Sequence, residues 1–241
     1  MQTIELKNVS FTYRVLKNRT GTLKELFRDF LGKRIRVLNY PALNNVSFTV
    51  NSGEVLAIIG RNGAGKSTLL KILARVLPPT SGSVRVSGSI APMIELGAGF
   101  HPEMSGEENV LLYSTLMGRD IRKTRERVEV IAEWAEVSDH MDFPLRTFSS
   151  GMVARLAFAT AADDVSDVLL IDEVLSVGDS KFKEKSKARM LELIRGGAAV
   201  IIVSHDMSAV LELSHKAIWL ENGEVKLYGP TKDVVSAYEK K

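Results

Sequence analysis

One glycine-rich segment constrains what this chain can fold into more than any other part of its sequence. Residues 60–68 read Gly-Arg-Asn-Gly-Ala-Gly-Lys-Ser-Thr and fit the pattern Gly-x-x-x-x-Gly-Lys-Ser/Thr. The segment follows an uninterrupted apolar run, Val55–Ile59, and precedes residues with the apolar spacing of a helix. An all-apolar strand is typical of a parallel sheet buried on both faces, and the loop that follows has the pattern of a phosphate cradle. The sequence therefore predicts an α/β fold that binds a nucleoside triphosphate.

The residue types in this loop match the chemistry of phosphate binding. Glycines let successive backbone N–H groups curl around phosphate oxygens, where a side chain would block the approach. The helix that follows points its positive N-terminus at the same anion. We expect the Lys66 ammonium to reach the β and γ phosphates and the Ser67 hydroxyl to ligate Mg²⁺. The predicted nucleotide contacts in this segment are Gly60, Arg61, Asn62, Gly63, Ala64, Gly65, Lys66, Ser67 and Thr68.

Polar residues follow two further apolar runs, which also read as buried parallel strands. Residues 168–171 are followed by Asp172 and Glu173, and residues 200–203 are followed two positions on by His205. The carboxyl edge of such a sheet is where α/β folds bind their ligands. We expect Asp172 to hold Mg²⁺ through water, Glu173 to polarise an attacking water, and His205 to contact the γ-phosphate.

The remaining patterns indicate one α/β domain in which strands alternate with helices. Alternation of apolar and polar residues marks the outer strands, and an Asn-Gly pair marks a hairpin turn. The expected elements are strands over 2–13 and 46–50, helices over 107–135, a hairpin of 217–220 and 225–228, and a last helix to about residue 240.

Length and composition exclude several classes of protein. A chain of 241 residues with 45% hydrophobic and 25% charged residues has globular composition. It contains no apolar run near the ~18 residues of a membrane span and no signal-peptide pattern at its start. It has no cysteine for disulfides or thiolate metal sites. We therefore expect a chain that faces the cytosol.

Positive charge is concentrated in one short stretch. From Arg14 to Arg36, eight basic and two acidic residues give +6, so a formal net charge of +3 leaves −3 for the rest of the chain. A nucleic-acid-binding protein usually spreads its positive charge over the fold and adds aromatic residues for stacking. The distribution favours a local contact, and no nucleic-acid partner is predicted.

A further motif gives the chain a family resemblance. Residues 148–152 read Phe-Ser-Ser-Gly-Met, and Gly151 stands 172 − 151 = 21 residues before Asp172. This segment resembles the signature motif, usually Leu-Ser-Gly-Gly-Gln, of ATP-binding cassette (ABC) ATPases. The phosphate loop, the acidic pair and His205 occur in the order of that family. The resemblance covers nearly the whole chain and identifies it as a member of that family.

The resemblance implies a fold, cofactors and further site residues. The fold is a P-loop NTPase core with a mostly parallel sheet, an N-terminal antiparallel β-subdomain and an inserted helical subdomain at about 92–165, all within one domain, 1–241. ATP and Mg²⁺ are the implied cofactors, and ATP hydrolysis is the implied activity. Tyr13 would stack on adenine, residues 176–179 would form the loop after the catalytic carboxylate, and His205 would be the switch histidine.

The resemblance also implies a homodimer of ATPase subunits. In this family the signature of one subunit closes over ATP held by the phosphate loop of the other. Ser149, Ser150 and Gly151 are therefore expected to contact the partner's ATP, with a hydroxyl and a backbone N–H at the start of a helix. ATP would drive dimerisation, and hydrolysis would reopen the dimer.

Departures from the family pattern indicate a branch of the family. Members usually carry a glutamine between the core and the helical subdomain, whereas the only glutamine here is Gln2. The corresponding stretch, residues 93–103, resembles exporters of cell-surface polysaccharides (O-antigen, capsule or teichoic acid), as do Ser150 and Met152 of the signature. Glu95 is a candidate substitute for the glutamine. The implied function is an ATPase that drives a separate membrane permease dimer from the cytoplasmic side of the membrane, as a peripheral subunit.

A second departure is an insertion at residues 14–40 that contains a short amphipathic helix. Residues 22–25 form a capping box, and apolar residues follow from Leu23 to Leu31 at helical spacing, with Gly32 as a stop. The helix either docks on its own domain or lies at the membrane surface. In the second case the 22–32 helix would contact the transported lipid-linked polysaccharide.

Three alternative functions fit the sequence less well. A cassette ATPase acting on ribosomes or DNA usually has two cassettes or a long coiled-coil insertion, and only 151 − 66 = 85 residues separate Lys66 from Gly151. A module that binds ATP without hydrolysis is disfavoured by the presence of both Glu173 and His205. The ATPase of a small-solute importer is the closest alternative, but it would normally keep the missing glutamine.

Overall fold

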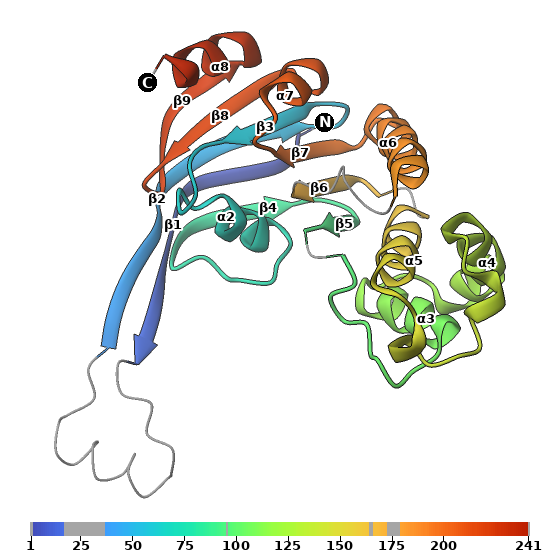
Figure 1. Ribbon diagram of the computed structural model, residues 1–241. Coiled ribbons are helices and arrows are strands. Elements are labelled where there is room, and N and C mark those ends of the chain that lie inside the picture. The colour runs from blue at the N-terminus through green and yellow to red at the C-terminus, as the bar shows by residue number, and fades with distance from the viewer. Residues whose placement is uncertain (1, 17–36, 95, 164–165, 173–178, 241) are drawn as a thin grey trace, which may run out of the picture.

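The computed structural model describes residues 2–16, 37–94, 96–163, 166–172 and 179–240 (Figure 1). Four features predicted from the sequence lie outside these residues: the helix over 22–32, Glu95, Glu173, and residues 176–178 of the loop after it.

A six-stranded sheet forms the centre of the molecule. Its strands, in spatial order, are β5 (Ile90–Met93), β6 (Val168–Asp172), β7 (Ala199–Val203), β3 (Val55–Ile59), β8 (Lys216–Glu221) and β9 (Glu224–Pro230). All neighbouring pairs are parallel except β8 and β9, which form the hairpin predicted from the Asn-Gly turn. A second sheet of three antiparallel strands has the order β2 (Val37–Asn51), β1 (Gln2–Leu16) and β4 (Ser81–Val86). The predicted α/β class, with its antiparallel N-terminal sheet, is confirmed.

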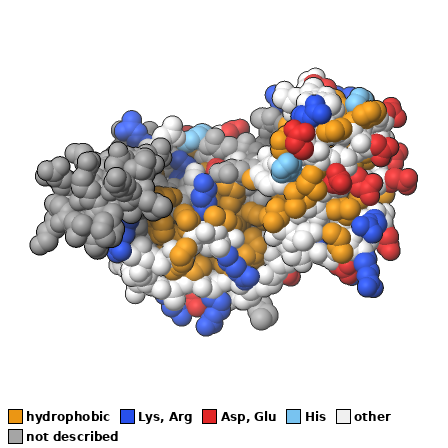
Figure 2. Space-filling model, turned by 90° about the horizontal axis from the view of Figure 1, so that it is seen from below, with side chains coloured by type: hydrophobic (Ala, Val, Ile, Leu, Met, Phe, Trp, Pro, Cys, Tyr) orange, Lys and Arg blue, Asp and Glu red, His pale blue; other side chains and the backbone are white. Residues whose placement is uncertain are grey.

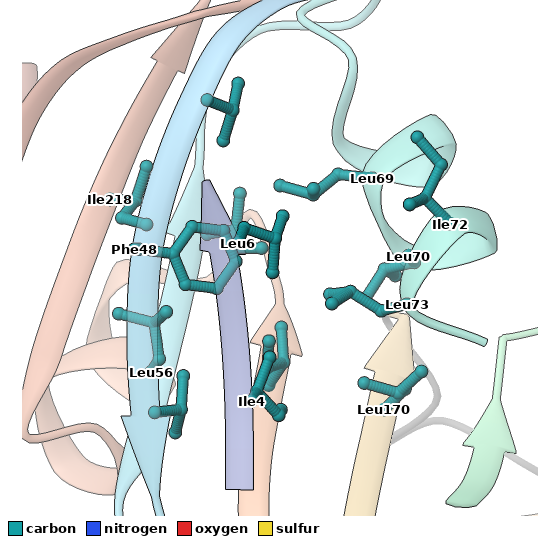
Figure 3. Packing of buried hydrophobic residues seen from close by; sticks show 14 of the residues in the cluster. Ile4, Leu6, Phe48, Leu56, Leu69, Leu70, Ile72, Leu73, Leu170 and Ile218 are labelled. Carbon is teal, nitrogen blue, oxygen red and sulfur yellow. The ribbon is translucent and has the colours of Figure 1, made fainter. Parts of the chain in front are cut away.

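The central sheet is buried on both faces, as its apolar strands predicted. Side chains alternate between the two faces of the sheet along β3. Leu56 and Ile58 belong to the core cluster on one face. On the other face, helices cover Val55, Ala57 and Ile59. On the first face, helix α2 (Lys66–Leu73) and the three-stranded sheet enclose the largest core cluster (Figure 3). The phosphate-loop helix is therefore fixed by packing along its whole length.

Helices cover the other face and form a subdomain beside it. Helices α6 (Ser180–Arg195), α7 (Met207–Leu213) and α8 (Thr231–Glu239) lie along the sheet, whereas α3 (Gly106–Leu116), α4 (Ile121–Ala135) and α5 (Ser150–Ala162) form the inserted unit, with short 3-10 helices at Ser138–His140 and Leu145–Thr147. The inserted helices have a core of their own that includes Val110, Ile131, Phe148 and Leu156. In Figure 1 this unit lies at the opposite side of the molecule from the end of the β1–β2 ribbon formed by residues 14–16 and 37–40.

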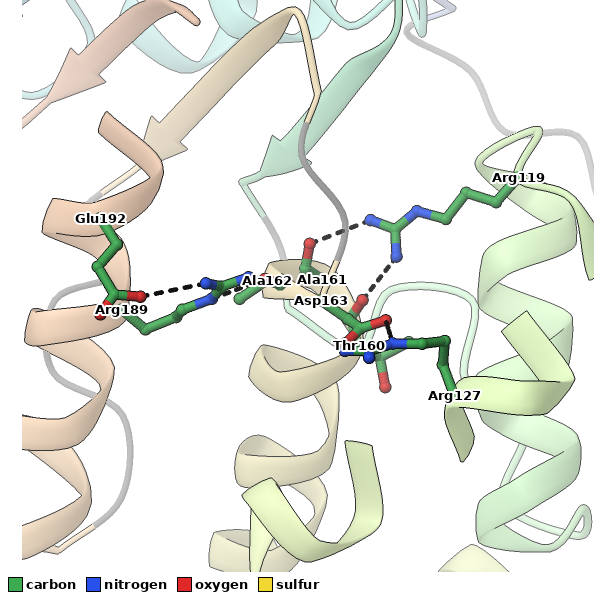
Figure 4. Close-up of polar contacts among 8 residues, drawn as sticks. All are labelled: Arg119, Arg127, Thr160, Ala161, Ala162, Asp163, Arg189 and Glu192. Carbon is green, nitrogen blue, oxygen red and sulfur yellow. Dashed lines mark hydrogen bonds and ion pairs between the residues drawn. The ribbon is translucent and has the colours of Figure 1, made fainter. Parts of the chain in front are cut away.

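Three arginines hold the C-terminal end of α5, the helix that begins within the predicted signature (Figure 4). Arg119 donates to the carbonyl oxygens of Thr160 and Ala161 at 2.7 and 3.0 Å. Arg189, on α6, donates twice to the carbonyl oxygen of Ala162, at 3.1 and 2.9 Å. The third, Arg127 on α4, pairs with Asp163. The last carbonyls of a helix have no partner within it and carry partial negative charge, so Arg119 and Arg189 stabilise this end directly. Arg127 neutralises the carboxylate of Asp163, the C-cap residue.

Replacement of Arg189 by alanine is expected to lower the free energy of unfolding by about 1–2 kcal/mol, at the low end of the range for a hydrogen bond to a charged group, because its side chain is 30% exposed. The melting temperature should fall by roughly 2–8 °C in a chain of this size. Arg195→Ala, at an exposed position at the end of the same helix, is the matched control. Equal melting temperatures for Arg189→Ala and Arg195→Ala would contradict the stabilising role of Arg189.

The structure differs from the predicted elements in two places. Residues 14–16 and 37–40, predicted within the insertion, continue β1 and β2 as a paired ribbon. The periodicity of the apolar residues did not predict β4 or β5. Pro92 lies inside β5, which is an edge strand, where a missing N–H is tolerated.

Candidate functional site

The predicted phosphate loop connects β3 to α2 at the carboxyl edge of the central sheet. Two of its glycines are pressed against neighbouring backbone. A Cβ on Gly60 would lie 2.2 Å from the carbonyl oxygen of Leu220, and a Cβ on Gly65 would lie 2.5 Å from that of Ala42. Gly65 also has φ +105°, a conformation that other residues rarely adopt. Glycine is therefore required at Gly60 and Gly65 because the loop packs closely against neighbouring backbone, in addition to the requirement for phosphate binding.

Lys66, the first residue of α2, is held inside this loop. Its side chain is 7% exposed, and the ammonium donates to the carbonyl oxygens of Gly60 at 2.7 Å and Arg61 at 3.2 Å. The positive charge is therefore fixed at the centre of the loop, close to the N-terminus of α2. A fixed ammonium beside a helix N-terminus is a strong attractor for phosphate.

A cavity of about 580 Å³ opens in front of the loop and brings together most of the predicted nucleotide contacts. The residues that line it are Tyr13, Tyr40, Pro41, Ala42, Asn62, Gly63, Ala64, Gly65, Lys66, Ser67, Thr68, Ile94, Asp172 and His205. Gly60 and Arg61 are not among them, and their carbonyls instead hold Lys66. Four lining residues, Tyr40, Pro41, Ala42 and Ile94, were not predicted.

Strand order explains why Asp172 and His205 reach the same cavity. Asp172 ends β6 and is paired with Val203, the last residue of β7, which is the neighbour of β3. His205 follows Val203 by two residues and is exposed.

The next residue, Asp206, caps α7, and hydrogen bonds from the Ser208 hydroxyl and the backbone N–H of Ala209 lower its pKa. The carboxylate of Asp206 is thus hydrogen-bonded to the N-terminus of α7, whereas Asp172 lines the cavity.

Tyr13 lies on β1 at the mouth of the cavity. Its hydroxyl is 3.3 Å from the Thr68 hydroxyl of α2, and its ring meets Phe11 edge-on at a centroid distance of 4.8 Å. These contacts fix the ring next to the phosphate-loop helix. The position suits the stacking role that the family resemblance implied for Tyr13.

The predicted signature residues lie apart from this cavity. Ser149 caps the N-terminus of α5, where its hydroxyl oxygen accepts from the backbone N–H of Met152 at 3.2 Å. Ser149, Ser150 and Gly151 are all exposed, and none lines the cavity of the same chain. They therefore present a helix N-terminus to the surroundings of the molecule.

Gln2, the chain's only glutamine, lies far from the phosphate loop. It lines a second cavity, of about 380 Å³, together with Asp167 and Ala198, which directly precede β6 and β7. That cavity is at the amino edge of the central sheet, opposite the phosphate loop. Within the described residues, the stretch that usually carries the family's glutamine contributes Ile94 to the cavity at the phosphate loop.

The residues present fit a triphosphate with a divalent cation. A Cβ on Gly63 would meet nothing within 4 Å, so the loop is open on the side that faces the cavity. One fixed ammonium, a helix N-terminus, the Ser67 hydroxyl and the Asp172 carboxylate provide donors for phosphate and oxygen ligands for Mg²⁺.

Comparisons with known proteins agree with this geometry. A family described as ABC transporter matches residues 43–176. The O-antigen export system ATP-binding protein RfbB of Klebsiella pneumoniae is 39% identical over 98% of this chain and 97% of its own length. The corresponding protein of Myxococcus xanthus is 40% identical over 99% of this chain, which spans 56% of that relative.

Two further comparisons cover a longer relative and the fold. The teichoic acids export ATP-binding protein TagH of Bacillus cereus is 40% identical over 98% of this chain, which spans 42% of that relative. A solved structure described as an ATP-binding subunit of an ABC transporter aligns with a TM-score of 0.74 at 22% identity, covering 98% of this chain and 93% of that one. At that identity the alignment supports the fold.

Proposed function

This chain belongs to the ABC transporter family, and from that premise we propose that it is the ATP-hydrolysing subunit of a polysaccharide exporter. The observation that carries the proposal is similarity over nearly the whole of this chain: two relatives named for O-antigen export are 39% and 40% identical to it over 98% and 99% of its length. A relative named for teichoic acids export is equally similar. O-antigen and teichoic acid are both cell-surface polymers, so this class of cargo is the one that the relatives have in common.

The cavity at the phosphate loop supports a role for each nucleotide contact. Lys66 neutralises the β and γ phosphates, while Ser67 and Asp172 hold Mg²⁺, Asp172 through water. Glu173 orients and polarises the attacking water, and His205 contacts the γ-phosphate from the next strand. When bound, Mg²⁺ would stabilise the negative charge that develops on the phosphate oxygens as the bond between ADP and the γ-phosphoryl group breaks.

The exposed signature supports a homodimer. Ser149, Ser150 and Gly151 stand at a helix N-terminus that does not reach the chain's own cavity. In a dimer they bind the γ-phosphate held by the partner chain, with the Ser149 hydroxyl and backbone N–H groups as donors. ATP is then needed to complete the interface, and its hydrolysis removes the contact that holds the dimer closed.

A membrane permease dimer is the proposed partner. Among the described residues, no helix has both the length and the apolar character to cross a bilayer. Hydrophobic side chains gather on the face of the molecule shown in Figure 2. Exposed apolar patches of this kind are typical of protein–protein contacts. The chain thus acts as a peripheral subunit on the cytoplasmic side of the membrane.

The basic insertion supports a contact at the membrane surface. Its net charge of +6 between Arg14 and Arg36 attracts anionic head groups, and the predicted 22–32 helix offers apolar residues to the interface. We place the lipid-linked polysaccharide near this helix.

A cell-based experiment tests the cargo. With Glu173→Gln as the only copy of the gene, cells should accumulate lipid-linked glycan on the cytoplasmic side and lose polymer from the surface. Cells that carry Glu184→Gln, a change at an exposed position on α6, should export normally. Loss of uptake of a small solute, with normal surface polymer, would instead support the importer alternative.

A further inference from the structure

The β1–β2 ribbon contains an irregularity beside the nucleotide cavity. Phe11 is paired with Leu43, but the next residue of β1, Thr12, is paired with Pro41. Ala42 is therefore an extra residue in β2, a β-bulge. Beyond the bulge the pairing is regular again, with Tyr13 opposite Tyr40.

This single extra residue decides which side chains share a face. Side chains alternate between the two faces of a strand, so a shift of one residue moves every later side chain to the opposite face. Without the bulge, Tyr13 would lie opposite Pro41, and Tyr40 would lie on the other face of the ribbon. With it, Tyr13 and Tyr40 are direct cross-strand neighbours, whose Cβ atoms are typically ~5 Å apart.

The bulge is locked to the phosphate loop and to the β8–β9 hairpin. The carbonyl oxygen of Ala42 fills the space where Gly65 and Gly223 lack a side chain: a Cβ there would lie 2.5 and 2.7 Å from it. Gly223 in turn donates to the Ala64 carbonyl at 3.0 Å and accepts from the Asn44 N–H at 2.8 Å. The position of Tyr40 is thus set relative to the phosphate loop by backbone contacts.

The two tyrosines differ in how they are held. Tyr13 is 38% exposed, with its hydroxyl next to Thr68 and its ring against Phe11. Tyr40 is 54% exposed and lines the same cavity. A large aromatic side chain that is more than half exposed, beside a ring expected to stack on adenine, provides additional surface for the base.

We infer that Tyr40 is a second nucleobase contact, and that Tyr13 and Tyr40 together form a two-ring platform for the purine of the bound nucleotide. The inference rests on the proposed function of the cavity and adds a residue to it. Tyr13 supplies the ring that is fixed against α2, and Tyr40 covers the part of the base that extends beyond it. Tyr40 therefore contributes to affinity for the base and leaves phosphate binding unchanged.

Equilibrium binding of Mg-ADP and of Mg-pyrophosphate separates the two contributions, because pyrophosphate has no base and neither ligand carries a γ-phosphate for the dimer contact. Tyr40→Ala should weaken Mg-ADP binding about five-fold or more and leave Mg-pyrophosphate binding unchanged. Tyr40→Phe, which keeps the ring, should bind Mg-ADP like the wild type. Asn39→Ala changes the adjacent exposed residue, on the opposite face of the ribbon, and should have no effect.

The remaining outcomes overturn the inference. Unchanged Mg-ADP affinity in Tyr40→Ala would mean that the ring does not contact the base. An equal loss of Mg-ADP and Mg-pyrophosphate affinity would mean that the substitution acts through the phosphate loop. If the wild type and Lys66→Ala bind Mg-ADP equally, the proposed function of the cavity fails, and the inference fails with it.

Discussion

Lys66→Ala is expected to weaken binding of Mg-ATP at least about 100-fold. In the structure Lys66 is 7% exposed and its ammonium is fixed by two loop carbonyls, so it meets the phosphates already oriented and partly dehydrated. Hydrogen bonds to charged groups contribute about 1.5–3 kcal/mol each, and the loss of two such bonds corresponds to a factor of roughly 10² or more. Isothermal titration calorimetry with Mg-ATP measures the change.

Two controls separate this effect from general damage. Lys71→Ala removes the same charge from the other end of α2 and should change Mg-ATP affinity by no more than about two-fold, because the helix N-terminus and the loop remain intact. Far-UV circular dichroism should show that Lys66→Ala remains folded. If Lys66→Ala is folded and binds Mg-ATP with wild-type affinity, the proposal that the phosphate loop binds the triphosphate is wrong.

Glu173→Gln is expected to slow ATP hydrolysis by roughly 10²–10⁴-fold and to leave ATP binding in place, because the amide keeps the size of the side chain but cannot act as a base. The ATP-bound dimer should then persist, since the step that reopens it is blocked. Steady-state phosphate release measures the rate, and size-exclusion chromatography at saturating Mg-ATP measures the association.

The matched variant is Glu184→Gln on α6, which should hydrolyse ATP at the wild-type rate and remain mostly monomeric after turnover. Addition of Ser149→Ala to Glu173→Gln should weaken the trapped dimer, because it removes the hydroxyl proposed to bind the partner's γ-phosphate. A monomeric Glu173→Gln chain at saturating ATP would count against the dimer in which each signature covers the other chain's nucleotide.

Local patterns in the sequence were sufficient for the phosphate loop and the class of fold. The glycines, lysine and serine of residues 60–68 are neighbours in the chain, and their spacing alone indicates a strand, a turn and a helix. The all-apolar runs that became β3, β6 and β7 indicated a sheet buried on both faces. Asp172 and His205 could be assigned to the carboxyl edge because parallel strands end on the same side.

The composition of the cavity wall, in contrast, depended on contacts between distant segments. The sequence places Tyr40 in an insertion and not in a strand. Nothing in the local pattern indicates that Ala42 is an extra residue in β2. Ile94 follows β5, an edge strand that is too short, and interrupted by a proline, to show the alternation of apolar and polar residues by which strands are predicted. The three arginines that hold the end of α5 come from the α3–α4 connection, α4 and α6, and only the packing of these segments against α5 brings them together.

The sequence by itself was therefore sufficient to predict the chemistry of the site: which groups are expected to bind phosphate, which carboxylate lies at the sheet edge, and which family the motifs resemble. The tertiary structure decided which further side chains line the cavity in front of the phosphate loop and how they are held. The physical reason is that periodicity reports the environment of each residue along its own strand or helix. The pairing register between strands, which one extra residue can change, is set by packing between elements far apart in the chain.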